Sequence, residues 1–419
     1  MRCSYELDEW RFEERISVGA GLTWSPAAVE AARLVALLAG VSYYKAGAAT
    51  VVDLGSMAVR PGEIEFLRSF YVDGLAEYAV RNHLSLADLS FVGGVPSPAG
   101  PAWTGPVDRP LIPFGGGLDS IVTVELLRSR YPAAALFVLN RQGDRFEAIE
   151  TAAAVSGLPI VRAEREIDPQ VLRSTENGFL NGHVPVTGVL SAIAVLAAVL
   201  DGRGAVVMSN EWSASSGNLV HEGLEVNHQF SKSLAFEEGF RSVLAGAIGG
   251  SFEYFSELRP YSELWIARQF AELTGYHGAF RSCNRAFQLD PARRATQWCG
   301  HCDKCCFIDL ILSPFLSRAA LGAIFGGREP LTDPALAGQF RTLVDLSGSA
   351  KPFECVGDAG ECRAAVILAA ARLDRAGDRV LQALATDVAA ADVPDVGSLL
   401  GPMGPHHIPD AFLPAAPLG

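Results

Sequence analysis

Three consecutive glycines precede an aspartate and a serine in the segment LIPFGGGLDS, residues 111–120. Apolar residues lead into the glycines and a helical pattern follows them, so we expect the chain to turn here from a strand into a helix. The backbone amides of such a turn surround the positive end of the helix dipole, which is a geometry that binds phosphate. The segment therefore predicts an anion site formed by Gly115, Gly116, Gly117, Asp119 and Ser120.

Two common nucleotide-binding motifs, G-x-x-x-x-G-K-[ST] and G-x-G-x-x-G, are absent from the sequence. GGGLDS instead resembles the SGGxDS loop of the PP-loop ATP pyrophosphatases, which cleave ATP between its α and β phosphates and adenylate a substrate; Gly115 stands where that family has its first serine. The resemblance implies that the glycine amides and Ser120 hold pyrophosphate and that Asp119 assists with phosphate or Mg²⁺. It also implies that the next strand borders the adenine at Val138, Leu139 and Asn140. The alternative is a glycine-rich connector that binds nothing.

Four cysteines have the spacing of a metal site. Cys283 is followed, after fifteen residues, by Cys299, Cys302 and Cys305. Four thiolates can close a tetrahedral zinc site, and because such a site leaves no position for water, we expect a structural Zn²⁺. Cys306 is expected to be a neighbour rather than a ligand. The spacing is similar to that of the 7-deazaguanine nitrile synthases, which are also PP-loop enzymes; the alternative is a group of buried cysteines without a metal.

Polar residues gather in three segments between these motifs: NGHVPVT (residues 181–187), SNEWSASSGN (209–218) and EVNHQFSKS (225–233). Each follows a predicted strand or opens a predicted helix. Ligands of parallel α/β sheets bind at the carboxyl ends of the strands, so these loops are where a substrate is expected. Solvated loops with helix caps explain any one of them equally well.

These segments together resemble the UDP-N-acetylmuramoyl-L-alanyl-L-glutamate epimerases, the MurL family. The resemblance rests on GVSYYKAG, GGGLDS, NGHVPVT, SNEWSASSGNLVHEGLEVNHQFSK, LRPYSEL, SCNRAF and WCGHCDKC, which occur in this order over residues 40–306. It implies an enzyme of peptidoglycan precursor synthesis that uses ATP and Mg²⁺ to invert the terminal L-glutamate of UDP-MurNAc-L-Ala-L-Glu.

The chemistry of such a reaction fits an adenylating loop. Removing the α-proton beside an ionised carboxylate would place a second negative charge next to the first, whereas the carbonyl of an acyl adenylate can delocalise the carbanion. One base that moves, or two bases that flank the carbon, would then suffice, and the sequence does not choose between them. The candidate acid–base residues are His183, Glu211, His221, His228 and Lys232, and candidates for binding the anionic substrate are Arg259, Arg281 and Arg285.

Short apolar runs alternate with helical segments from residue 109 to about residue 315. This alternation predicts an α/β fold with a parallel sheet and helices on both faces, as in PP-loop (HUP-like) domains. We expect an N-terminal α+β domain at residues 1–108, the PP-loop domain with its zinc segment (283–306) at 109–315, and a mostly helical C-terminal region with a Pro-rich end at 316–419. Ser25 and Pro26 are expected to begin an N-terminal helix.

The composition is that of a globular protein: 49% of the 419 residues are hydrophobic and 19% are charged. A formal net charge of −13 opposes broad nucleic-acid binding. The longest strongly apolar helical segment, residues 189–200, is shorter than the ~20 residues of a membrane span, and no secretory leader is recognisable. The crowded cysteines favour a reducing compartment. We therefore expect a cytoplasmic enzyme that binds a small molecule and neither nucleic acid nor membrane.

Two other function classes fit the motifs. One is another PP-loop adenylating enzyme, such as an amide or nitrile former, which would consume ammonia or another nucleophile. The other is a zinc-stabilised nucleotide binder that never releases pyrophosphate.

Overall fold

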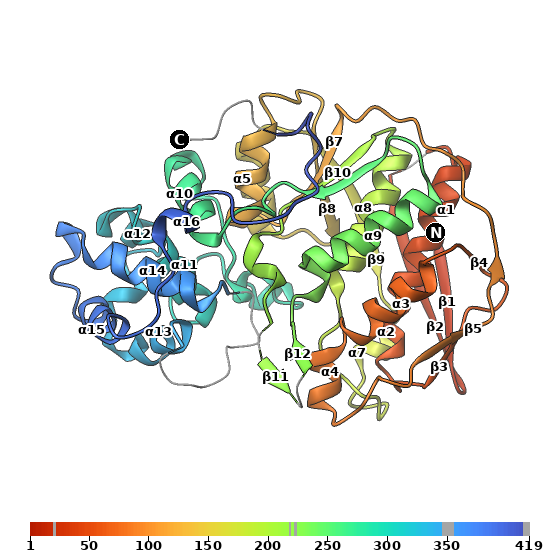
Figure 1. The fold of residues 1–419 in the computed structure, drawn as a ribbon, viewed down its shortest axis with the longest axis horizontal. Helices are drawn as coiled ribbons and strands as arrows, with labels where there is room; N and C mark the ends of the chain where they lie inside the picture. The colour runs from red at the N-terminus through yellow and green to blue at the C-terminus, as the bar shows by residue number, and fades with distance from the viewer. Residues whose placement is uncertain (20–21, 218, 222–223, 346–355, 414–419) are drawn as a thin grey trace.

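The computed structural model describes residues 1–19, 22–217, 219–221, 224–345 and 356–413. Its centre is a seven-stranded sheet in the order β1-β2-β9-β8-β7-β10-β13 (Figure 1). The five neighbouring strands β9, β8, β7, β10 and β13 run parallel, and β2 joins β9 antiparallel. The strands are β1 (Arg2–Leu7), β2 (Trp10–Val18), β7 (Pro110–Pro113), β8 (Ala135–Asn140), β9 (Ile160–Glu166), β10 (Ala205–Met208) and β13 (Glu253–Ser256).

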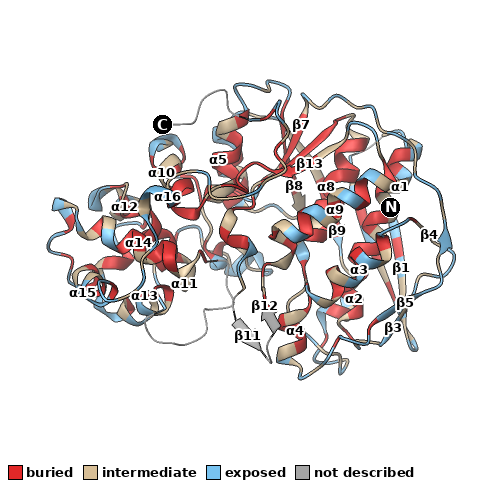
Figure 2. Ribbon diagram, in the orientation of Figure 1, coloured by how far each residue is buried: buried red, intermediate tan, exposed pale blue. Residues whose placement is uncertain are grey.

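Successive residues of the central strands enter two different hydrophobic cores, one on each face of the sheet (Figure 2). Leu111 and Phe137 face the core that contains α1 (Pro26–Ala39), α3 (Glu63–Val72), α8 (Val186–Leu200) and α9 (Leu234–Ala247). Ile112 and Leu136 face the core that contains α5 (Leu118–Leu127), α6 (Glu147–Ser156) and α10 (Glu263–Glu272). Because both faces are covered, the strands are apolar throughout. The predicted α/β sheet is confirmed.

The order of the parallel strands places the ligand site. Numbered along the chain, the five strands lie in the order 3-2-1-4-5, so the direction of winding reverses between β7 and β10. Ligands of such sheets bind at this reversal, outside the carboxyl ends of the strands. The glycine run begins at Gly115, with only Phe114 between it and the end of β7, and therefore lies at this point.

The N-terminal strands extend the central sheet. Cα partners across β2 and β9 run from Arg15 with Glu166 to Val18 with Ala163, and a buried ion pair joins Arg165 to Glu14 at 2.8 Å. The remaining N-terminal elements are α2 (Val41–Tyr44), α4 (Ala76–Arg81) and two small parallel sheets, in which β3 (Val51–Asp53) pairs with β5 (Ser90–Val92) and β4 (Ala58–Val59) with β6 (Val95–Pro96). Strands β1 and β2 thus form one edge of the main sheet, and a domain limit at residue 108 stays a prediction.

Helix α1 starts as its sequence indicates. The Oγ of Ser25 accepts a hydrogen bond from the amide of Ala28 at 3.1 Å, and Pro26 is the first helical residue. Within the described residues, one helical stretch, Pro26–Tyr44, is long and apolar enough to cross a membrane, and it is longer than the segment singled out from the sequence. Since 72% of its apolar window is buried, packing in the core accounts for its hydrophobicity.

The C-terminal region is helical and ends in a strap, residues 403–413, that returns to the sheet (Figure 1). Phe412, at the end of the strap, stacks on Tyr131 with ring centroids 4.5 Å apart and packs edge-on against Phe255 at 4.8 Å. Arg130 donates hydrogen bonds to three carbonyls of the strap. The helices before the strap are α11 (Asp303–Leu312), α12 (Arg318–Ile324), α13 (Ala337–Leu343), α14 (Ala359–Ala370), α15 (Arg379–Val388) and α16 (Val396–Leu399).

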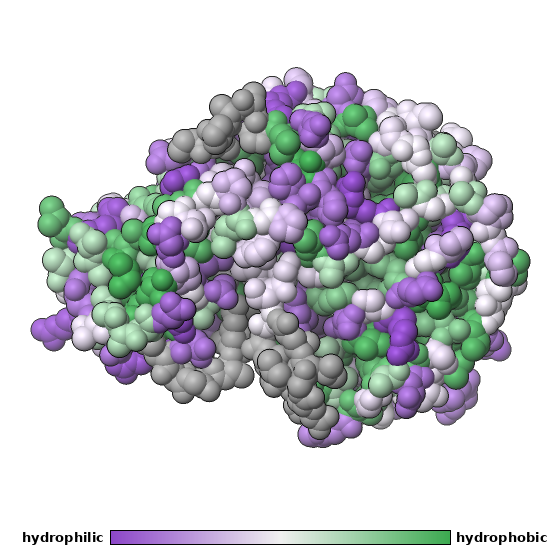
Figure 3. All heavy atoms as spheres, in the orientation of Figure 1, coloured by the Kyte–Doolittle hydropathy of each residue, from purple (hydrophilic) through white to green (hydrophobic). Residues whose placement is uncertain are grey.

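On the face of the molecule that Figure 3 shows, apolar residues are interspersed with polar ones. Exposed hydrophobic side chains include Trp24, Val51 and Val95, which belong to separate N-terminal segments. Scattered apolar residues of this kind are normal on a globular protein.

Candidate active site

The glycine run turns the chain from β7 into α5. Gly117 is the N-cap residue of α5, with extended backbone angles, and Leu118 is the first helical residue. Gly116 has a φ of +75°, and a Cβ at this position would lie 2.8 Å from the carbonyl oxygen of Ala148. Gly115 has no atom within 4 Å of its Cβ position. The turn therefore requires glycine at position 116 for both backbone angle and space, whereas position 115 is open.

A cavity of about 380 Å³ lies over this turn. The carboxyl ends of β7, β8 and β10 form its floor, with Phe114, Leu139 and Ser209 among the lining residues. Its charged lining consists of the basic side chains Arg281, Lys232 and Lys304 and the carboxylate of Asp119. Three cations against one anion, beside a helix N-terminus, make a setting that favours a polyanionic ligand.

Two buried polar groups near this floor lack hydrogen bonds within the described part of the chain. Asn140, 3% exposed at the end of β8, has no partner for either its amide nitrogen or its amide oxygen. The Oγ of Ser209, in the cavity lining, has none either. Orphaned buried polar groups are rare, and a ligand with donors and acceptors would satisfy them. Of the residues predicted beside the adenine, Leu139 lines the cavity and Val138 is buried in the core.

The predicted phosphate-binding residues come together at the cavity. Gly115, Gly117, Asp119 and Ser120 all line it. The Ser120 hydroxyl donates to the Gly117 carbonyl at 3.1 Å, which holds it at the first turn of α5. The arrangement can surround an anion with backbone amides and one hydroxyl.

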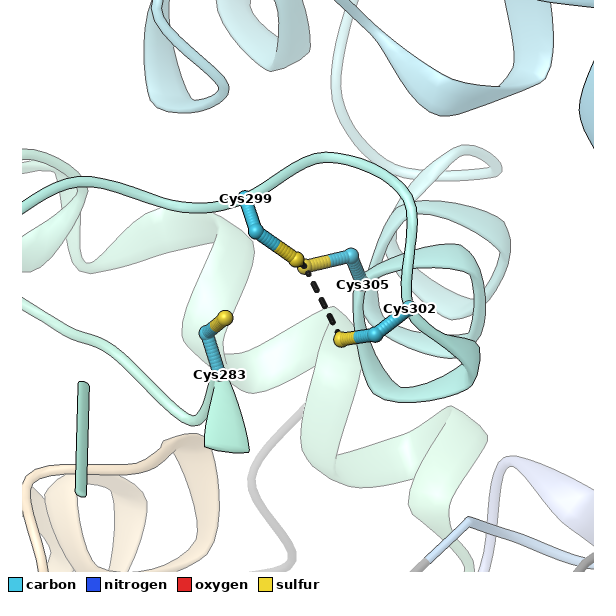
Figure 4. A group of neighbouring side chains, drawn as sticks. All are labelled: Cys283, Cys299, Cys302 and Cys305. Atoms are coloured by element: carbon cyan, nitrogen blue, oxygen red, sulfur yellow. Dashed lines mark hydrogen bonds between the residues drawn. The ribbon is translucent and has the colours of Figure 1, made fainter. Parts of the chain in front are cut away.

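The four predicted metal ligands form one cluster (Figure 4). The sulfur atoms of Cys283, Cys299, Cys302 and Cys305 all lie within 4.8 Å of one another. Cys302 is the N-cap residue of α11 and Cys305 lies in its first turn, while Gly300, with a φ of +72°, turns the chain between the second and third ligands. Four thiols at these separations fit a tetrahedral zinc ion, so the donor set suits the predicted metal.

The cysteine segment also contacts the glycine turn. The amide of Arg281, two residues before Cys283, donates to the carbonyl of Gly116 at 3.2 Å. A Cβ on Gly117 would lie 3.0 Å from the Oγ of Ser282. The segment that carries the first cysteine thus forms one wall of the cavity. Cys306 is buried outside the cluster, and burial raises the pKa of its thiol.

Two of the candidate acid–base residues meet a glutamate from the N-terminal region. A carboxylate oxygen of Glu77 and one ring nitrogen from each of His183 and His228 lie within 4.8 Å of one another. The Nδ1 of His228 is hydrogen-bonded to a carboxylate oxygen of Glu77, and the rings of the two histidines are 4.0 Å apart between centroids. Sequence reasoning missed Glu77, because with Arg81 it reads as an ordinary ion pair along a helix.

Burial sets the charge of this cluster. Burial, and after it the charge of the neighbouring His228, lowers the pKa of His183 to about 4, so that its ring is neutral at neutral pH. Burial alone would raise the pKa of Glu77, but its hydrogen bond to His228 and the charges around it lower the pKa below the usual value. The cluster therefore pairs an ionised carboxylate with imidazole rings.

Arg259 lies fully buried behind the cavity. Its guanidinium forms a 3.0 Å ion pair with Glu237 and donates to the backbone carbonyls of Glu211 and Lys232 at 2.9 and 2.6 Å. These contacts favour a positioning role, in which Arg259 fixes Lys232 at the cavity wall, over direct contact with a substrate. The Nζ of Lys232 donates to the side chain of Gln229 at 2.9 Å.

The other candidates are dispersed. Glu211 is buried. The pKa of Glu263, behind the cavity, is raised first by burial, then by the charge of Asp119, and then by the charge of Glu211. Arg285 is exposed and is not part of the described cavity lining. His221 is the last residue of β11 (Leu219–His221), which pairs with β12 (Leu224–Val226), and its side chain lies outside the described part of the structure.

Comparison with known proteins identifies the relatives of the chain. The model of the MurL N-terminal domain matches residues 1–257, and that of the MurL C-terminal domain matches residues 279–397. The UDP-N-acetyl-alpha-D-muramoyl-L-alanyl-L-glutamate epimerase of Xanthomonas oryzae pv. oryzae is 37% identical over 387 residues, 91% of this chain and 84% of the relative. The proteins of the same name from Salinispora tropica (42% over 339 residues; 80% and 72%) and Micromonospora sp. (40% over 390 residues; 91% and 84%) are similar.

Proposed function

The chain belongs to the MurL family, and we propose that it is an isomerase that converts the terminal L-glutamate of UDP-MurNAc-L-Ala-L-Glu to D-glutamate in peptidoglycan precursor synthesis. The names of its relatives describe an epimerase of this substrate. An anionic small molecule of this kind suits a site whose charged lining residues are predominantly basic.

We further propose that ATP activates the terminal carboxylate by adenylation, with release of pyrophosphate, as in PP-loop ATP pyrophosphatases. The observation that carries this proposal is the cavity at the reversal of strand order, which is lined by the GGGLDS turn, two lysines and an arginine. Amides of residues 115–117 and the Ser120 hydroxyl would hold phosphate oxygens. Asn140 and Ser209, whose polar groups lack partners among the described residues, would face the remainder of the nucleotide.

Two metals belong to this proposal. Asp119 would hold a Mg²⁺ that accompanies ATP and neutralises phosphate charge. Cys283, Cys299, Cys302 and Cys305 would hold a structural Zn²⁺ that fixes the wall beside Gly116 and Gly117. We also propose the division into residues 1–108, 109–315 and 316–419 and a cytoplasmic location.

Activation makes the proton transfer accessible to ordinary side chains. In the adenylate, the electron pair released from Cα moves onto the acyl carbonyl instead of onto a carboxylate that is already charged. A proton returned to the opposite face gives the D configuration, and hydrolysis of the adenylate releases the product with AMP.

An assay of pyrophosphate release, combined with the configuration of the product, tests this function. With ATP and Mg²⁺, the protein should release pyrophosphate and form D-glutamate on UDP-MurNAc-L-Ala-L-Glu and should not turn over free L-glutamate. An amide or nitrile former would instead need ammonia and would retain the L configuration. A protein that only binds the nucleotide would release no pyrophosphate, with or without UDP-MurNAc-L-Ala-L-Glu.

A further inference from the structure

The cluster of Glu77, His183 and His228 is built from three parts of the chain that are far apart in sequence. Glu77 lies on α4, His183 in the loop before α8, and His228 in the loop before the 3₁₀ helix Phe230–Lys232. Glu77 is 5% exposed, and the side chain of His228 is 12% exposed. A buried carboxylate beside two partly buried titratable rings often marks a functional site, because each group then depends on the others for hydrogen bonds and charge.

An ion pair and hydrogen bonds orient the side chains of the cluster. The Nε of Arg81 lies 2.6 Å from one oxygen of Glu77, and the other oxygen is bonded to the Nδ1 of His228. This carboxylate fixes the ring orientation of His228, in the manner of the aspartate in a catalytic triad. His183 is hydrogen-bonded to the backbone of His228; since this bond favours the protonated ring, the ring nitrogen is its donor. The second nitrogen of His183 is then the acceptor in the neutral ring.

The cluster adjoins the cavity. Thr187, four residues after His183, and Lys232, four residues after His228, both line it. The charge of Lys232 is one of those that lower the pKa of His183, so the two side chains are close enough to interact. Among the described residues, the charged groups that act on His183 are His228, Glu77 and Lys232. Arg81 pairs with Glu77, and Lys45 donates to Asn181, two residues before His183.

We propose that His183, supported by His228 and Glu77, is the base that takes the proton from one face of the substrate's Cα. This assignment rests on the proposed epimerase function and names the acid–base group of the same site. The Cα–H bond breaks, its electron pair moves onto the carbonyl of the activated carboxylate, and the proton bonds to the acceptor nitrogen of His183. Glu77, whose charge raises the pKa of His183, stabilises the positive charge that this ring then carries.

The spacing of the rings limits them to one face. Two bases that flank a carbon within hydrogen-bond reach stand roughly 6 Å apart, whereas the ring centroids of His183 and His228 are only 4.0 Å apart. The pair therefore acts from a single side. A second group must return the proton on the other side; Lys232, a basic side chain of the cavity lining, takes that role in the proposal.

Separating proton exchange from activation tests the proposal. In deuterated water with ATP, Mg²⁺ and UDP-MurNAc-L-Ala-L-Glu, His183→Asn should reduce deuterium incorporation at Cα by about 100-fold or more. Pyrophosphate release should stay near the wild-type rate, because the adenylate still forms and hydrolyses with the L configuration. His407→Asn, which removes an exposed histidine paired with Glu238, is the matched control and should leave both rates unchanged.

The positioning role of Glu77 has its own readout. Glu77→Gln removes a charge that raises the pKa of His183, so the acid limb of the exchange rate should move to lower pH and Glu77→Asp should restore it in part. Glu253→Gln, which removes a carboxylate of the edge strand β13 that pairs with Arg241, should leave the limb in place.

Two outcomes would overturn the assignment. Exchange at the wild-type rate in His183→Asn would exclude the ring as the base. Loss of pyrophosphate release together with exchange would show that the cluster serves folding or binding. If the wild-type protein itself releases no pyrophosphate, the proposed function fails, and that result is distinct from either outcome.

Discussion

At the scale of single residues, the proposed phosphate binding depends most on the first turn of α5. Ser120→Ala removes a hydroxyl at the helix N-terminus, and Asp119→Ala removes the carboxylate of the cavity lining. Each should lower pyrophosphate release by about 100-fold or more, since preorganised charge contacts of this kind contribute on that scale. Ser129→Ala, an exposed serine beyond the other end of α5, is the matched control for a steady-state pyrophosphate assay. Near-normal rates in both loop variants would contradict the phosphate-site assignment.

Adjacent glycines of the same turn should respond differently to substitution. Gly116→Ala forces a side chain into a left-handed conformation and against the carbonyl of Ala148, so it should cost about 1–3 kcal/mol in the free energy of unfolding. Gly115→Ala meets open space and should change stability by less than about 0.5 kcal/mol. Denaturant titration of both variants measures the difference. Equal losses would show that the turn differs from the one described.

The sequence alone indicated some residues of the site and missed others. GGGLDS and the cysteine spacing are local patterns, so they indicated Asp119, Ser120 and the four thiols, which the structure brings together. Glu77 reaches the site through tertiary packing, and no local pattern marked it. Lys304 stands within the quoted cysteine motif, but nothing in that motif indicated that its side chain lines the cavity. Arg259 looked available for an anion in the sequence, but its partners Glu237 and the two carbonyls come from other elements.

At the scale of elements, the cysteine segment should depend on a metal. Cys283→Ser removes one of four ligands, so the purified protein should lose most of its zinc and the wall beside Gly116 should loosen, with lower pyrophosphate release. Cys306→Ala, in which a buried thiol outside the cluster is removed, should keep one zinc per chain. Metal analysis of protein purified without chelator decides this. Absence of zinc from the wild-type protein would refute the assignment.

Prediction of the elements succeeded where periodicity was strong. The apolar runs of β7, β8 and β10 and the capped start of α1 follow directly from local sequence. The pairing of β2 with β9 could not be read in the same way, because it joins residues about 150 positions apart and depends on the shape of the finished sheet. For this reason the N-terminal strands were expected in a separate unit.

Protonation of His183 makes the stability of the elements around it depend on pH. The pKa of this ring is about 4 in the folded protein and about 6.5 in an unfolded chain. The unfolded chain therefore binds more protons between these values, so this contribution to stability is complete above pH 6.5 and is lost as pH falls toward 4. His183→Asn should flatten the decline of the melting temperature between pH 7 and pH 4. An unchanged slope would mean that the ring is not buried as described.

At the scale of the whole molecule, the strap formed by residues 403–413 ties the C-terminal region to the sheet. Phe412 is 1% exposed between Tyr131 and Phe255. Phe412→Ala should lower the free energy of unfolding by about 3–5 kcal/mol, because it leaves a cavity. Leu413→Ala, at a residue that is 36% exposed, should cost far less. Similar thermal midpoints for the two variants would show that the strap does not stabilise the fold.

The central claim is that ATP-dependent activation permits inversion at Cα. The most direct measurement is deuterium incorporation at Cα of the terminal glutamate of UDP-MurNAc-L-Ala-L-Glu in deuterated water, with and without ATP. The account predicts deuterium in the D-glutamate product when ATP and Mg²⁺ are present and none when ATP is omitted. Exchange without ATP would contradict it, as would AMP formation with the L configuration and the original hydrogen retained.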